Sequence, residues 1–93
     1  MKKLPNIHPG EVLLEEFLKP LGLSQLAFAR HLGVSFKRIN EIVNGRRAIT
    51  PETAWLFAKA LGNSPQFWMN LQTTYDLAHH RAERRVQRLS VAV

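Results

Sequence analysis

The chain is 93 residues long and 45% hydrophobic, so it can bury one compact core but hardly a second, and we expect a single domain over 1–93. Its 13 lysines and arginines against 7 acidic residues give a formal net charge of +6, which favours nucleic acid over an acidic small substrate. The lack of cysteine excludes disulfides and thiolate metal sites, and no segment approaches the length of a membrane span. We therefore expect a soluble, cytoplasmic protein without a membrane partner.

Apolar residues recur every three or four positions along most of the chain, a spacing that predicts an all-α fold of five helices. The predicted helices begin at prolines or after capping serines and threonines. They span residues 9–19, 25–32, 36–44, 51–61 and 64–88. The helix over 51–61 is apolar around much of its circumference, Trp55 included, so we expect it to be central and buried on more than one side. The last helix is the longest and runs into a basic tail.

The segment from about 24 to 45 has the pattern of a helix-turn-helix unit, in which two helices cross closely about a short turn. Ala29 is small enough to lie in the crossing, and Gly33 suits a turn that needs a positive φ. The apolar residues expected to form the core shared by the two helices are Phe28, Leu32, Val34, Ile39 and Ile42. The sequence therefore predicts the angle between the helices as well as the helices themselves.

The first half of the second helix of this unit offers side chains to a major groove, which is wide enough to admit an α-helix. The candidate readers of base edges are Phe36, Lys37, Arg38 and Glu41. Lys37 is the first choice for guanine O6 or N7, and the alternative for Lys37 and Arg38 is simple solvation. Phe36 either contacts a thymine methyl group or folds back onto the domain.

Amide, hydroxyl and guanidinium groups around the same helix are suited to phosphate oxygens. The candidate phosphate contacts are Gln25, Ser35, Asn40, Asn44, Arg46 and Arg47. Between Arg30 and Arg47 the basic residues exceed the acidic ones by four, whereas the first helix is acidic. This asymmetry supports a double-stranded DNA partner more strongly than net charge does. The competing interpretation is an interaction module whose basic face serves solubility alone.

The chain lacks a convergent group of catalytic side chains. The histidines available as metal ligands are His8, His31, His79 and His80, and their spacing is unlike that of a zinc hydrolase. The serines are explained as helix caps or tail residues, and no glycine-rich phosphate loop is present. We expect neither an enzyme nor a protein with a cofactor, metal or small-molecule substrate.

Residues 24–47, SQLAFARHLGVSFKRINEIVNGRR, resemble the lambda-repressor-like helix-turn-helix of the XRE family. The stretches HPGEVLLEEFLKPLGLSQ, NGRRAITPETA and FWMNLQTTYDL extend the resemblance to the HigA-type antitoxins of toxin-antitoxin modules, over residues 7–77. Phe36, Trp55 and the basic tail depart from the pattern of that family. The resemblance implies a five-helix domain that binds a palindromic operator, represses its own operon and neutralises a RelE-like, mRNA-cleaving toxin, HigB. The alternative is a stand-alone phage-type regulator without a toxin partner.

A palindromic operator also implies a homodimer, because two half-sites lie about 34 Å apart and match a two-fold axis. The last helix carries apolar residues at helical spacing that could form the contact. These residues are Phe67, Trp68, Leu71, Tyr75 and Ala78. The same face could instead fill the core of one protomer. We expect a shared role, with Leu71 and Tyr75 at the dimer interface.

Overall fold

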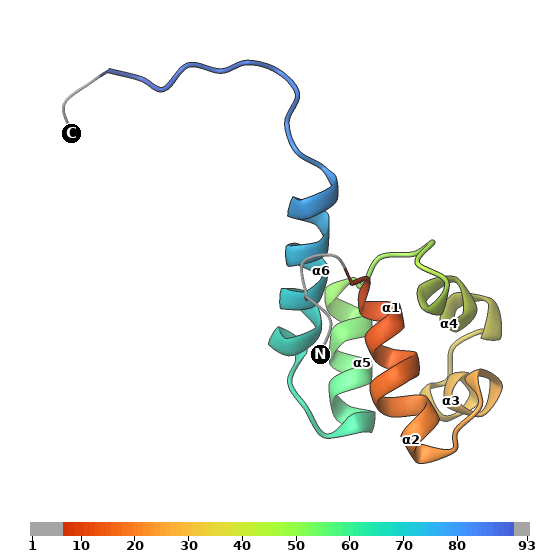
Figure 1. Cartoon of the computed structure of the whole chain (residues 1–93). Coiled ribbons are helices and arrows are strands. Elements are labelled where there is room, and N and C mark those ends of the chain that lie inside the picture. The colour runs from red at the N-terminus through yellow and green to blue at the C-terminus, as the bar shows by residue number, and fades with distance from the viewer. Residues whose placement is uncertain (1–6, 91–93) are drawn as a thin grey trace.

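A computed structural model describes residues 7–90 of the chain (Figure 1). Regular structure in this range is entirely helical. The elements are α1 (Pro9–Val12), the π-helix η2 (Leu13–Leu18), α2 (Lys19–Leu21), α3 (Gln25–Leu32), α4 (Phe36–Val43), α5 (Pro51–Leu61) and α6 (Pro65–His79). Because α1, η2 and α2 follow one another without a break, they form one helical stretch, and the predicted all-α, five-helix fold is confirmed. Residues 1–6 and 91–93 of the expected single domain lie outside the described range.

The first helical stretch widens in its middle, where the N–H of Lys19 bonds to the carbonyl of Leu14 instead of to that of the residue four positions back. Pro20 follows directly. In a regular α-helix its ring would press against the carbonyl of Glu16. The wider turn relieves this contact, so the helix continues through Pro20 to Leu21 and ends later than the predicted Lys19.

Capping side chains set the starts of the four later helices, as the sequence predicted. Each accepts a hydrogen bond of 3.0–3.3 Å from a backbone N–H of the first helical turn, which has no partner within the helix. The capping residues are Ser24, Ser35, Thr50 and Ser64. Pro51 and Pro65 occupy the first helical position after two of these caps, where their missing N–H costs nothing.

The last helix is shorter than predicted: α6 ends at His79, and residues 80–90 form no helix, whereas the sequence suggested helix to about 88. The segment beyond His79 packs against nothing that would stabilise a helix. Val86 and Leu89 are 83% and 79% exposed. Four arginines would also lie close together on a continued helix and repel one another. Since packing of an apolar face supplies most of a helix's stability, the chain leaves the helix where that packing stops.

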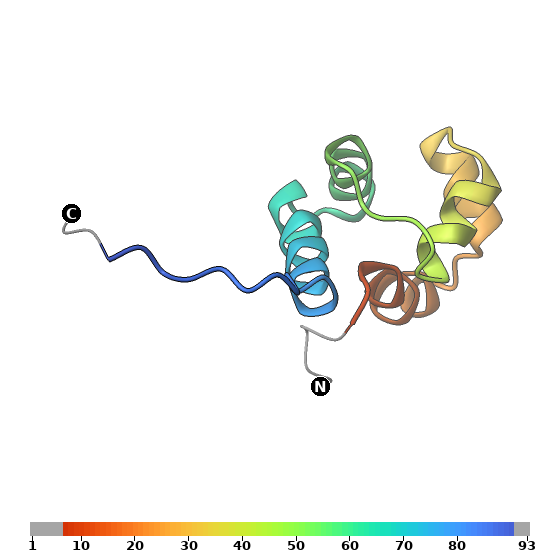
Figure 2. The ribbon, with the colours of Figure 1, turned by 90° about the horizontal axis from the view of Figure 1, so that it is seen from above.

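The core lies between two halves of the molecule: Figure 2 shows α3 and α4 on one side, α6 on the other, and the first helical stretch and α5 between them. Aromatic rings bridge the halves. Phe57 of α5 lies 5.4 Å from Phe28 of α3 and 5.1 Å from Trp68 of α6, between ring centroids. The expectation for α5 is corrected at Trp55, which is 56% exposed. One face of α5 points to solvent, because helices pack on its other sides only.

Candidate nucleic-acid interface

The helix-turn-helix unit has the geometry that its sequence predicted. Ala29, 1% exposed, lies beneath the turn, and the N–H of Val34 bonds to its carbonyl at 3.0 Å. Gly33 adopts a φ of 75°, a conformation that a side chain would disfavour. Ile39 and Ile42 are fully buried against the rest of the core. The unit is therefore a fixed pair of crossed helices that leaves the opposite face of α4 open.

The first helical stretch contacts α4 through Gly10, a residue that the sequence pattern did not single out. A Cβ atom built on Gly10 would lie 2.5 Å from the carbonyl carbon of Ile42 and 2.9 Å from the Cα of Val43. Both are backbone atoms, so the two helix backbones meet directly at this point. The sequence offered a weak signal, a glycine after Pro9 in a helix start. Gly10 thus determines how closely α4 approaches the body of the domain.

The loop between α4 and α5, residues 44–50, is anchored to α6 by Gln72, a residue of the FWMNLQTTYDL stretch whose anchoring role the sequence did not predict. Gln72 is 4% exposed, and its Oε1 accepts the N–H of Ile49 at 2.7 Å. Its Nε2 donates to Oδ1 of Asp76 at 2.8 Å, so both ends of the buried amide are used. This anchor fixes the backbone of the loop that carries Arg46 and Arg47.

Two of the four candidate base readers, Phe36 and Lys37, lie open on the first turn of α4. Lys37 is exposed and, among residues 7–90, forms no ion pair. Phe36 is 46% exposed, so its ring is not folded into the core. Contact of these side chains with guanine and a thymine methyl group remains a prediction that this geometry permits.

The other two candidate base readers, Arg38 and Glu41, have partners within the protein. The Nη2 of Arg38 donates to Oγ1 of Thr53 at 2.6 Å and to Oε1 of Glu52 at 3.1 Å. The guanidinium of Arg38 therefore ties α4 to the first turn of α5. Glu41 accepts a hydrogen bond from Nε of Arg47 at 2.9 Å. These pairs leave Lys37 as the best-placed charged reader.

Three candidate phosphate contacts form a line of hydrogen bonds across the unit. The Nδ2 of Asn40 donates to Oε1 of Gln25 at 3.0 Å, and the Nδ2 of Asn44 donates to Oδ1 of Asn40 at 3.1 Å. Ser35 caps α4, and Arg46 and Arg47 are exposed on the loop. The structure therefore brings the six candidate phosphate contacts around both ends of α4, on the rim of its open face.

The candidate dimer residues are divided by the structure, and the prediction for Trp68 and Leu71 is corrected. Trp68 is fully buried and donates its Nε1–H to Oδ1 of Asn63 at 2.8 Å, and Leu71 is 6% exposed. Both fill the core of their own protomer. Phe67 remains 37% exposed, and Leu77, which the prediction omitted, is 72% exposed. The large apolar side chains that α6 leaves exposed are therefore Phe67, near its start, and Leu77, near its end.

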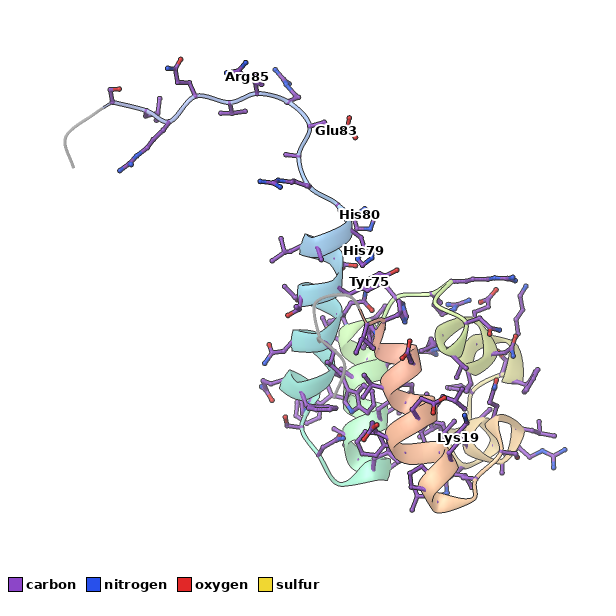
Figure 3. The ribbon with its side chains drawn as sticks, in the orientation of Figure 1. Lys19, Tyr75, His79, His80, Glu83 and Arg85 are labelled. Carbon is purple, nitrogen blue, oxygen red and sulfur yellow. The ribbon has the colours of Figure 1, made fainter. Side chains whose placement is uncertain are left out.

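Tyr75, the remaining candidate dimer residue, packs against histidines (Figure 3). Its ring lies edge-on to His8 at 4.9 Å and stacks on His79 at 4.1 Å. The Nδ1 of His8 accepts the N–H of Gly10 at 2.9 Å, so the neutral imidazole caps α1. Burial lowers the pKa of His8 from its usual value, and the charge of Asp76 opposes this shift in part. The start of α1 is thereby coupled to the end of α6.

The described residues hold no group of three His, Asp or Glu side chains that could bind a metal ion. Within the same range, no helix is long and apolar enough to cross a membrane. The candidate interface is the open face of α4 with its rim of amides and arginines.

A fixed pair of crossed helices with one exposed, cationic face defines a helix-turn-helix domain. The chain belongs to the helix-turn-helix family, whose profile matches residues 14–68, and within it to the XRE type that includes the HigA antitoxins. Over 91 residues it is 47% identical to virulence-associated protein I of Dichelobacter nodosus, covering 98% of this chain and 82% of that protein.

Two solved structures from Pseudomonas aeruginosa share this architecture. PA4674, solved in complex with its operator DNA, is 39% identical with a TM-score of 0.83, and the match covers 89% of this chain and 96% of that one. The antitoxin HigA, solved with the higBA promoter, is 44% identical with a TM-score of 0.78 over 80% of each chain. The predicted family is confirmed by these matches.

Proposed function

We propose that this chain is a repressor that binds a palindromic operator upstream of its own operon as a homodimer. The observation that carries the proposal is the open face of α4, where Lys37 has no partner among the described residues and amides and arginines form the rim. Support comes from the Pseudomonas aeruginosa relatives, PA4674 with its operator DNA and HigA with the higBA promoter. The proposed repression requires only that the protein bind operator DNA and involves no chemical reaction.

The proposed contacts divide into those that read sequence and those that fix register. Lys37 donates to O6 or N7 of guanine, and Phe36 packs on a thymine methyl group. Gln25 and the loop arginines bind phosphates, which hold α4 in the groove. Arg38 and Glu41 reach bases only by leaving their partners in the protein, so in the paired state they orient α4 and the loop.

A dimer matches the two-fold symmetry of a palindrome, because each half-site then meets one α4. We propose that the exposed side of α6, which carries Phe67 and Leu77, supplies the contact between protomers. Tyr75, the other candidate dimer residue that is not fully buried, packs beside His8. A dimer formed there would bury apolar side chains that are exposed to solvent in the single chain.

We further propose that the protein neutralises a RelE-like, mRNA-cleaving toxin encoded next to it. Support for this part is the relationship to HigA, an antitoxin, over four fifths of each chain. The two activities are separable, since operator binding depends on α4 and toxin neutralisation requires a partner protein. A stand-alone regulator would have the first activity without the second.

Binding to the DNA upstream of the gene tests the repressor proposal. The dimer should bind this duplex more tightly than a scrambled one, and its affinity should fall steeply as salt rises. Replacing Arg46→Ala, which breaks no ion pair within residues 7–90, should weaken both duplexes alike and reduce the slope of log affinity against log salt by about one per protomer. Equal affinity for the two duplexes at every salt concentration would contradict sequence-specific repression.

Co-expression with the neighbouring small open reading frame tests the antitoxin proposal. The neighbour should arrest growth alone, and this chain should bind it and restore growth. A neighbour that is neither toxic nor bound would overturn the antitoxin part and leave a stand-alone regulator. The Lys37→Ala variant is the matched control, because it should lose operator preference and keep the rescue of growth.

A further inference from the structure

The segment that follows α6, residues 80–90, is a cationic arm that the helix-turn-helix unit does not use. It holds four arginines and one glutamate, a surplus of three positive charges out of the formal net charge of +6. Every residue of the arm is exposed, and none of its arginines forms an ion pair within residues 7–90. Figure 3 shows Glu83 and Arg85 on an extended backbone, clear of all the helices. The arm therefore offers unpaired guanidinium groups to a partner.

The arm begins close to the loop that carries Arg46 and Arg47. A Cβ placed on Gly45, in that loop, would lie 3.8 Å from Cγ of His8. His8 contacts the ring of Tyr75, which stacks on His79, the last residue of α6. Two side chains thus connect the proposed phosphate-binding loop to the base of the arm. The arm therefore starts near this loop, although α6 itself lies on the side of the molecule away from α3 and α4 (Figure 2).

We propose that the arm binds the phosphates of operator DNA beyond those that the helix-turn-helix unit reaches, an inference that rests on the proposed function. Eleven extended residues span about 36 Å, roughly one turn of the duplex, so the arm can follow the backbone past the half-site. Arginine suits this role, because its planar guanidinium donates two parallel hydrogen bonds to a phosphate. These contacts add affinity without sequence preference.

A protein partner is the competing occupant, since Ala82, Val86 and Leu89 would align on one face if the arm became helical. The charges favour DNA. The arm has four cationic side chains and two large apolar ones, and Tyr75 and His8 link its base to the loop that carries Arg46 and Arg47. A protein groove that recognised the apolar face would leave most of the arginines unused.

The test compares the full chain with the Arg84→Gln/Arg85→Gln variant by titrating duplex binding against salt. The variant should lose affinity for operator and scrambled DNA by equal factors, and its log-log slope should fall by about two per bound protomer. The matched control is Lys19→Gln/Lys59→Gln, which removes the same charge from exposed sites away from the arm and should keep the slope. Figure 3 shows Lys19 at the end of the molecule opposite the arm.

An unchanged slope in the Arg84→Gln/Arg85→Gln variant would overturn the inference while leaving operator binding intact. The inference also fails if this variant binds DNA normally but loses capture of the co-expressed neighbouring protein, since the arm would then serve a protein partner. A full chain that binds neither duplex would instead defeat the proposed function itself. A single series of salt titrations, together with one pull-down of the neighbouring protein, distinguishes these three results.

Discussion

Replacing Gly10 by alanine should both destabilise the domain and displace the reading helix. The added Cβ would overlap the backbone of Ile42 and lie 2.9 Å from the Cα of Val43, and neither backbone can rotate away as a side chain would. Overpacking of this kind costs about 3 kcal/mol at the upper end of its range. Alanine regains about 1 kcal/mol of helix propensity. We expect a net loss of about 2 kcal/mol in the free energy of unfolding.

For a domain of this size, a loss of about 2 kcal/mol lowers Tm by about 8–16 °C. Urea and thermal unfolding followed by circular dichroism measure both quantities. The matched control is Gly22→Ala, which meets no atom within 4 Å but adds a side chain at a φ of 64° and should cost about 1–2 kcal/mol.

Only Gly10→Ala should also weaken operator binding under conditions where both variants are folded, because Gly22 lies away from α4. A Gly10→Ala variant with the unfolding midpoint of the natural chain would refute the close backbone approach. A loss of operator affinity no larger than that of Gly22→Ala would refute the positioning of α4 by Gly10.

Three further variants test other parts of the structure. The folded state lowers the pKa of His8, so the contribution of His8 to the free energy of unfolding is complete above its ordinary pKa of 6.5 and is lost as pH falls through the folded pKa. His8→Asn keeps a capping side chain that does not titrate. The urea midpoint of this variant should therefore change less between about pH 7 and pH 5 than that of the natural chain. Gln72→Leu leaves the buried N–H of Ile49 without an acceptor and should cost about 1–3 kcal/mol in urea unfolding, and a smaller cost would show that the loop anchor is weak. Leu77→Ser should raise the dissociation constant of the dimer in analytical ultracentrifugation, whereas Leu21→Ser, which replaces another exposed leucine, should leave it unchanged. Equal dissociation constants for the two variants would exclude the exposed side of α6 as the dimer interface.

The features that the sequence predicted correctly depend on neighbours in the chain. A serine followed by an apolar helix gives a cap, and Gly33 gives a left-handed turn, whatever the rest of the protein does. The end of α6 was missed because helix propensity continues past His79 while packing stops there.

The unpredicted parts of the interface depend on residues distant in the chain. Gly10 meets α4 more than 30 positions away, and Gln72 meets Ile49 across 23 positions. The pairing of Arg38 with Glu52 spans 14 positions, and a lone arginine on a helix gives no sign of it. Such contacts follow from how the helices pack, which hydrophobic periodicity alone does not determine.

The most direct test of base recognition by α4 is the effect of Lys37→Ala on affinity for the upstream operator and for a scrambled duplex at one salt concentration. If Lys37 reads a base from the open face of α4, the operator affinity should fall by about 1–3 kcal/mol, roughly 5- to 150-fold, with a small change on the scrambled duplex. The control is Lys59→Ala, which removes an exposed lysine of α5 and should change neither affinity by a comparable factor. An equal loss on both duplexes, or none on the operator, would contradict the placement of base recognition on α4.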